Sequence, residues 1–172
     1  SMTRPNTPAQ AWSALVDGNH RFVEGSPAHP NQDVDRRAAL AGEQVPFAAL
    51  FGCADSRLSA EIIFDVGLGD LFVVRNAGQV IAETILGSLE YAVEVLGVSV
   101  IVVLGHDECG AIRATMDSSI GKLRAKGEFI QNIVARIQPT VTTAFANGKH
   151  HIDEVTELHI HDTIDEIMTR SK

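Results

Sequence analysis

Two short apolar runs, each followed within a few residues by a cysteine, constrain the fold of this chain more than any other feature. The first run, 47–51, leads to Cys53, and the second, 98–104, leads through His106 to Cys109. Both runs are uncharged and bounded by proline or glycine, a pattern typical of buried strands. If they form neighbouring parallel strands, their carboxyl ends meet at one sheet edge, and Cys53, His106 and Cys109 converge there.

Helical patterns alternate with the strand-like runs, which predicts an α/β fold with a central, mainly parallel sheet and right-handed crossovers. We expect one domain, residues 1–172, with an N-terminal helical arm at about 8–41. The predicted helices are 8–23, 35–41, 59–64, 84–96, 111–116, 129–137 and 152–168, and the third predicted strand is 71–74. A glycine- and lysine-containing connection is expected at 121–127. Pro139 is expected to interrupt or begin a helix.

The charge balance limits the partners that this chain can have. Its 14 basic and 22 acidic residues give a net charge of -8, which argues against a nucleic-acid or anionic membrane surface. No stretch approaches the roughly 20 apolar residues of a membrane-spanning helix, and the first residues show no apolar signal region. Two cysteines without an export signal fit a reducing compartment, so we expect a cytoplasmic protein.

The three converging side chains are a candidate metal site. Two thiolates and an imidazole suit zinc, and three protein ligands would leave a fourth position for water or substrate, as in catalytic zinc sites. The residues alone also allow Cys53 and Cys109 to be buried core thiols and His106 a hydrogen-bonded loop residue. A disulfide between the two cysteines is a third interpretation.

The chain resembles the β-class carbonic anhydrases, most closely the actinobacterial members. The resemblance rests on Cys53-Ala54-Asp55-Ser56-Arg57, on Gly105-His106-Asp107-Glu108-Cys109-Gly110, and on the intervening blocks 67–78 and 87–93, within a match over about 9–171. It implies Zn2+ bound by Cys53, His106 and Cys109, and the reversible hydration of carbon dioxide to bicarbonate and a proton.

The resemblance also assigns roles beside the metal. Asp55 would accept the proton of a zinc-bound hydroxide and aim a lone pair at carbon dioxide, while Arg57 would hold Asp55 ionised through a forked pair. In this family the aspartate can also become the fourth metal ligand at lower pH, which predicts activity that rises steeply above neutral pH. Taken alone, Asp55 and Arg57 would be interpreted as a turn with a local ion pair.

Four further residues match the family's substrate pocket. Gln44 matches a glutamine that reaches the neighbouring subunit's pocket, and Phe72, Tyr91 and Gly78 match positions that line it. For Phe72 and Tyr91, plain core packing is the alternative interpretation.

The resemblance implies a homodimer or homotetramer whose N-terminal helix embraces the partner. Trp12 and Phe22 suit that role, and packing against their own core is the alternative. Leu50 replaces the tryptophan of an inhibitory bicarbonate site, so we expect no such site and a structural or interface role for Arg75. The family's C-terminal edge strand has no match here, and the histidines 150, 151, 159 and 161 are expected at the surface.

Three other functions compete with this interpretation. The same scaffold could hydrolyse carbonyl sulfide or carbon disulfide, which are linear like carbon dioxide, or it could be a non-catalytic zinc-binding protein. Retention of Asp55 and Arg57 argues against the second of these. A nucleotide-binding loop at 105–110 is disfavoured, because Asp107 and Glu108 would repel phosphate.

Overall fold

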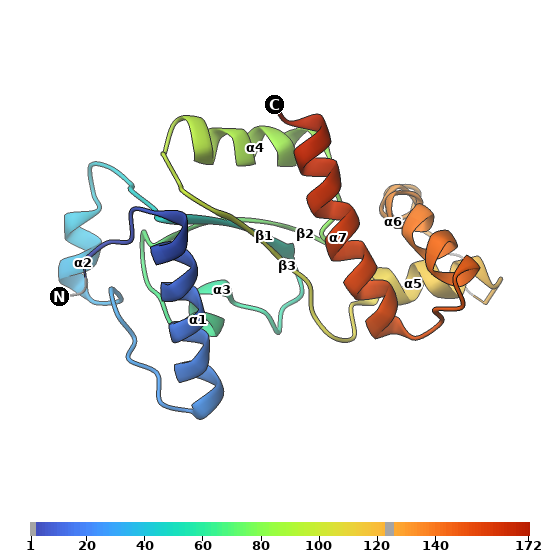
Figure 1. Cartoon of the computed structure of the whole chain (residues 1–172), viewed down its shortest axis with the longest axis horizontal. Helices are drawn as coiled ribbons and strands as arrows, with labels where there is room; N and C mark the ends of the chain where they lie inside the picture. The colour runs from blue at the N-terminus through green and yellow to red at the C-terminus, as the bar shows by residue number, and fades with distance from the viewer. Residues whose placement is uncertain (1–2, 123–125) are drawn as a thin grey trace. The chain divides into compact units, whose positions relative to one another are not determined.

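The computed structural model, which describes residues 3–122 and 126–172, contains a three-stranded parallel sheet (Figure 1). The strands are β1 (Ala48–Cys53), β2 (Leu71–Asn76) and β3 (Ile101–Leu104), in the order β2-β1-β3. All six residues of β1 are buried, as expected for the middle strand of a parallel sheet. The α/β architecture with its N-terminal helix is therefore confirmed.

The strand ends differ slightly from the prediction. β1 and β2 each run two residues further, so Cys53 is the last residue of β1. β3 begins later than predicted, at Ile101. The Val98 amide donates to the carbonyl of Ala92 in helix α4 (Glu83–Glu94) instead of to a neighbouring strand.

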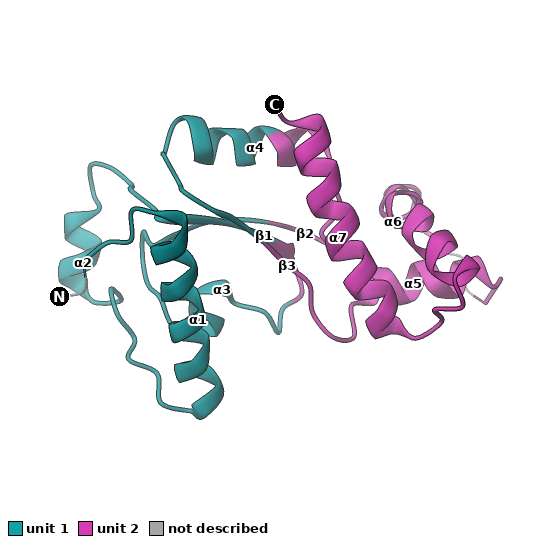
Figure 2. Cartoon of the chain, in the orientation of Figure 1, with its two compact units in different colours: residues 1–51, 56–74, 87–102 teal, residues 52–55, 75–86, 103–172 magenta. Residues whose placement is uncertain are grey.

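The contacts group the residues into two compact units (Figure 2): unit 1 is 1–51, 56–74 and 87–102, and unit 2 is 52–55, 75–86 and 103–172. Each strand begins in unit 1, and its last two residues belong to unit 2. The prediction of a single domain over 1–172 stays a prediction.

Unit 1 contains α1 (Pro8–Glu24), α2 (Val34–Ala39) and α3 (Ala60–Ile63). The Thr7 hydroxyl accepts from the Gln10 amide at the start of α1, and Gly25 ends the helix in the left-handed conformation. Leu15 is buried, whereas Trp12 and Phe22 are 55% and 42% exposed. Neither aromatic side chain is fully buried in the core.

Unit 2 contains α5 (Gly110–Ser119), α6 (Glu128–Ala146) and α7 (Ile152–Arg170), which pack on one another. Of the connection predicted at 121–127, residues 123–125 lie outside the described part of the chain. None of the helices in the described ranges is both long enough and apolar enough to cross a membrane.

The prediction that Pro139 interrupts or begins a helix is wrong, because α6 runs through it. A proline in a helix interior removes one hydrogen bond, at a cost of about 3 kcal/mol. Buried side chains on both sides of Pro139, such as Ile137 and Val141, continue the same packed face, and their burial offsets that cost.

Candidate metal centre

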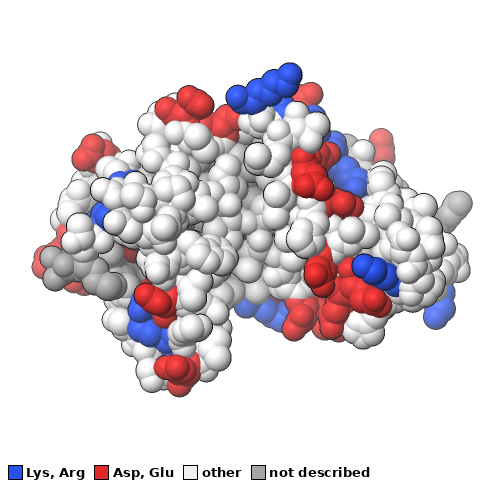
Figure 3. Space-filling model, viewed as in Figure 1, with Lys and Arg blue, Asp and Glu red and all other residues white. Residues whose placement is uncertain are grey.

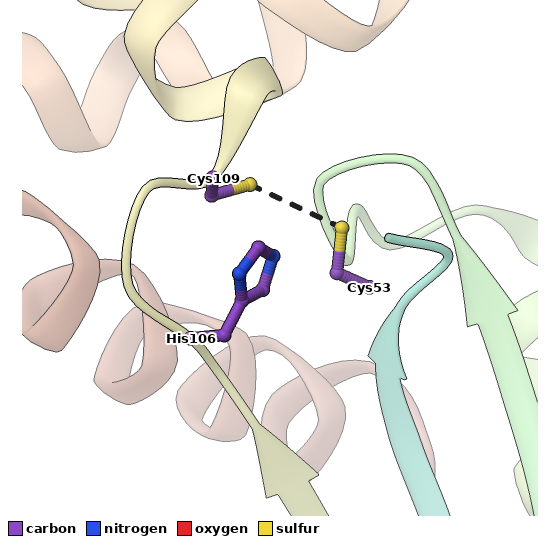
Figure 4. Close-up of side chains that lie close together, drawn as sticks. All are labelled: Cys53, His106 and Cys109. Carbon is purple, nitrogen blue, oxygen red and sulfur yellow. Dashed lines mark hydrogen bonds between the residues drawn. The ribbon is translucent and has the colours of Figure 1, made fainter. Parts of the chain in front are cut away.

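Cys53, His106 and Cys109 come together in unit 2, as the sequence predicts. Cys53 ends β1, His106 follows β3 by two residues, and Cys109 is the residue that caps α5. Their ligand atoms all lie within 4.8 Å of one another, and the imidazole points between the two sulfurs (Figure 4). The cluster is at the carboxyl ends of the strands, where parallel sheets place their binding sites.

The spacing of the cluster fits a tetrahedral zinc ion. With zinc–sulfur bonds of about 2.3 Å, two sulfurs in a tetrahedral site are about 3.8 Å apart. The Cys53 and Cys109 sulfurs are 4.0 Å apart, and both cysteines are free thiols, so the disulfide interpretation is not supported.

The imidazole of His106 is oriented as a metal ligand. Its Nδ1 lies 2.7 Å from the backbone carbonyl of Asp107, which can only accept, so Nδ1 is the donor in that contact and Nε2 is the nitrogen left to bind a metal. Nε2 is buried and has no hydrogen-bond partner among the described residues. A buried nitrogen lone pair without a partner is costly, and a metal ion would satisfy it.

Burial raises the pKa of the Cys109 thiol, and backbone hydrogen bonds from Ile112 and Ala111 oppose that rise. Because a thiolate is the binding form, metal binding here must displace a proton. The two amides belong to the first turn of α5, where the positive end of the helix favours the thiolate.

Arg75 fixes the backbone beside the first ligand. Its Nε donates to the Cys53 carbonyl at 2.8 Å, and its NH2 group donates to the Asp55 carbonyl at 2.7 Å. The amide of Ala54 also donates to the Asn76 carbonyl at 2.8 Å. These bonds tie the end of β1 to β2, and they support the structural role expected of Arg75.

Asp55 lies beside the cluster, with its Oδ2 atom 3.9 Å from the His106 Nε2 atom. Its side chain is only 14% exposed. Arg57 is exposed and belongs to unit 1, so its pairing with Asp55 stays a prediction.

Of the four predicted pocket residues, Gly78 belongs to unit 2 with the cluster, and its amide donates to the Cys53 sulfur at 3.3 Å. Gln44, Phe72 and Tyr91 belong to unit 1. Gln44 is exposed, and the Phe72 and Tyr91 rings pack together with their centroids 5.9 Å apart. Their contacts with substrate stay a prediction.

The expectation of four surface histidines is wrong for His159, which is 6% exposed. His150, His151 and His161 are exposed, as expected. His159 and His161 are two residues apart and therefore lie on different faces of the helix. The two-residue spacing does not say which of the two faces is buried. His159 lies three or four positions from the buried residues Val155, Thr156 and Thr163, so it lies on the packed face.

A small cavity of about 10 Å3 adjoins the three ligands, with room for about one water molecule. Its lining also includes Gly78, His159 and Thr156. The Thr156 hydroxyl is buried and has no hydrogen-bond partner within the described residues, so a polar guest would be stabilised there.

Comparisons with known proteins agree with this site. A family model described as carbonic anhydrase matches residues 48–172. Carbonic anhydrase 2 of Mycobacterium tuberculosis is 52% identical over 168 residues, covering 97% of this chain and 81% of the relative. The carbonic anhydrase of Mycolicibacterium smegmatis is 49% identical over the same shares. Among solved structures, the β-carbonic anhydrase CcaA superposes with a TM-score of 0.70 at 26% identity, covering 92% of this chain and 74% of that one.

Proposed function

This chain belongs to the carbonic anhydrase family, and we propose that it is a β-class enzyme that interconverts carbon dioxide and bicarbonate with zinc as its metal. The observation that carries the proposal is the Cys53, His106 and Cys109 cluster with its unpartnered buried imidazole nitrogen. Two sulfurs and one nitrogen, all buried or nearly so, form a donor set that zinc favours. When bound, zinc would supply a coordinated water with its pKa lowered toward 7.

The chain's own residues would then orient the reaction. The Asp55 carboxylate lies close to the His106 imidazole, so it could accept a hydrogen bond from a water or hydroxide bound at the metal position. Arg57 is proposed to keep Asp55 ionised. Arg75 supports this arrangement by fixing the backbone on both sides of Ala54.

The Asp55 carboxylate is also a candidate fourth ligand. A distance of 3.9 Å to the Nε2 atom of His106 leaves it only a short movement from any ion held by that nitrogen. Ligation by Asp55 would close the site, and water would compete with it better as hydroxide becomes more abundant. We therefore expect hydration activity to rise steeply above neutral pH.

The substrate pocket and assembly follow the family resemblance. We propose that Gln44, Phe72, Tyr91 and Gly78 line the pocket, with Gln44 acting across a subunit interface in a homodimer or homotetramer. The exposed Trp12 and Phe22 support association, because large aromatic side chains in water favour burial against a partner. We further propose a cytoplasmic location, which the two free thiols support.

Stopped-flow measurement with carbon dioxide, carbonyl sulfide and carbon disulfide tests the proposed reaction from pH 6.5 to 8.5. The zinc-loaded protein should hydrate carbon dioxide far faster than it hydrolyses the two sulfur compounds, with a rate that rises across this range. Faster turnover of a sulfur compound would reassign the activity. A flat pH profile with zinc fully bound would contradict ligation by Asp55, and no turnover would indicate a non-catalytic zinc protein.

A further inference from the structure

His159 is a buried imidazole that the reaction described above does not use. It lies on the packed face of α7, and its Nε2 atom is 2.7 Å from the Gly78 carbonyl oxygen. Because that oxygen can only accept, Nε2 must carry a proton and donate it. Burial is the main influence on His159 and lowers its pKa, so the ring is neutral and has a single N–H group, which is committed to Gly78.

Gly78 connects this histidine to a metal ligand. The carbonyl of Gly78 accepts from His159, and the amide of the same residue donates to the Cys53 sulfur at 3.3 Å. Gly78 has a φ of +79°, which favours glycine, and an added Cβ would lie 2.7 Å from the Ala111 Cβ atom. The amide and the carbonyl of Gly78 are both hydrogen-bonded, and Ala111 lies close to its Cα atom. The orientation of this backbone sets the direction of the Gly78 N–H group.

Side-chain hydrogen bonds also fix the other residues of the turn 76–80. The Asn76 side chain donates to the Val80 carbonyl and accepts from the Val80 amide, at 2.8 and 2.9 Å. The Gln79 side chain donates to the Thr163 hydroxyl at 3.2 Å, and that hydroxyl donates to the His159 carbonyl at 2.7 Å. Two side chains of the turn and two residues of α7 thus fix one short segment.

We propose that His159 is a positioning residue, which holds Gly78 so that its amide stays hydrogen-bonded to the Cys53 thiolate. A hydrogen bond to a coordinated thiolate withdraws negative charge from sulfur, so the metal keeps more of its Lewis acidity. Groups bonded directly to a metal ligand, as the Gly78 amide is, change metal affinity or activity by about 10–100-fold, and His159 acts on the site through that amide. This inference rests on the proposed metal site. It gives α7 a role in setting the metal affinity and Lewis acidity of that site.

Cobalt substitution tests the role without measuring turnover. In His159→Phe the ring shape stays but the donor is lost, and in His159→Gln an amide donor remains near the position of Nε2. We expect the thiolate-to-cobalt absorption band to move to longer wavelength in His159→Phe and to return toward the wild-type position in His159→Gln. Zinc affinity, measured by competition with a chelator, should fall by up to about 10-fold in His159→Phe alone, because His159 acts through the Gly78 amide.

Matched controls separate positioning from folding. His161→Phe alters an exposed histidine of the same helix and should leave the band and the affinity unchanged. A His159→Phe protein with a lower melting temperature but an unchanged cobalt band would overturn the inference and leave His159 a purely structural role.

A second measurement needs no variant. Long-range 1H–15N spectra of the wild-type protein should show His159 as the neutral tautomer protonated at Nε2, and an unprotonated Nε2 would overturn the inference. Failure of the wild-type protein to bind cobalt or zinc would instead contradict the proposed function itself. The two failures are therefore distinguishable.

Discussion

Asp65 is a carboxylate with almost no solvent contact, at 1% exposure, and its charge is satisfied entirely within unit 1. Arg21 donates to it at 2.6 Å, and the amides of Ala28 and His29 donate at 2.8 and 3.0 Å. Burial raises the pKa of Asp65, but these donors together outweigh it and hold the pKa below the ordinary 3.8. The connection after α1 is thereby tied to the segment that follows α3.

Replacing Asp65 should show how much this ionised group stabilises the protein. Asp65→Asn should lower the free energy of unfolding at pH 7 by about 2–4 kcal/mol, because Arg21 loses its buried partner. A carboxylate with a lowered native pKa stabilises above its unfolded pKa and loses that effect as the pH falls through its native pKa. The difference between wild type and variant, measured by urea unfolding, should therefore shrink below about pH 4.

Asp17→Asn, on the exposed surface of α1, is the matched control and should change stability by less than about 0.5 kcal/mol. A difference for Asp65→Asn that stays constant from pH 7 to pH 3 would contradict the assignment of an ionised carboxylate.

At the scale of elements, α1 and α3 approach so closely at Gly18 that no side chain fits. An added Cβ on Gly18 would overlap the Phe64 carbonyl at the end of α3. In contrast, Gly87 lies in the exposed face of α4 with nothing within 4 Å of its added Cβ. Helix propensity alone would favour alanine at both positions, by about 1 kcal/mol each.

The two glycines should therefore respond to alanine with opposite signs. Gly18→Ala should destabilise the protein by about 2 kcal/mol or more, because the helices must separate to relieve the overlap. Gly87→Ala should stabilise it by about 0.5–1 kcal/mol. Both values can be measured by denaturant unfolding, and stabilisation by Gly18→Ala would show that α1 and α3 do not pack as described.

Local pattern predicts the elements of this fold well where one physical signal dominates. β1 and α1 are found within two residues of their predicted limits, because uninterrupted apolar runs and helix caps act locally. The environments of Pro139 and His159 differ from prediction because they depend on tertiary packing, which overrides the usual preferences of proline and histidine. The convergence of Cys53 and Cys109 was predictable from the topology. The hydrogen bond from Gly78 to Cys53 depends on a turn conformation that sequence spacing does not reveal.

At the scale of the whole molecule, net charge is the property that bears on possible partners, and it is -8. Over α7, which carries six acidic residues and one basic residue, the visible face shows mainly Asp and Glu side chains (Figure 3). A surface of this charge would repel a phosphate backbone. The exposed aromatic side chains of α1, Trp12 and Phe22, suit a protein partner.

Association through α1 can be tested in solution. Trp12→Glu should lower the oligomeric state seen by sedimentation velocity, because a charge would be buried where an aromatic ring packs. Ser13→Glu, which places the same charge at the next exposed residue of α1, is the control and should associate as the wild type does if Trp12 is the contact. An unchanged oligomer in Trp12→Glu would exclude Trp12 from the interface.

The central claim is that Cys53, His106 and Cys109 bind the zinc that the hydration of carbon dioxide requires. Its most direct test is zinc content and stopped-flow hydration, measured together on the wild-type protein and on Cys53→Ser. We predict about one zinc per chain with rapid hydration for the wild type, and a loss of both in a folded Cys53→Ser protein. Wild-type protein without stoichiometric zinc, or hydration that survives Cys53→Ser, would contradict the claim.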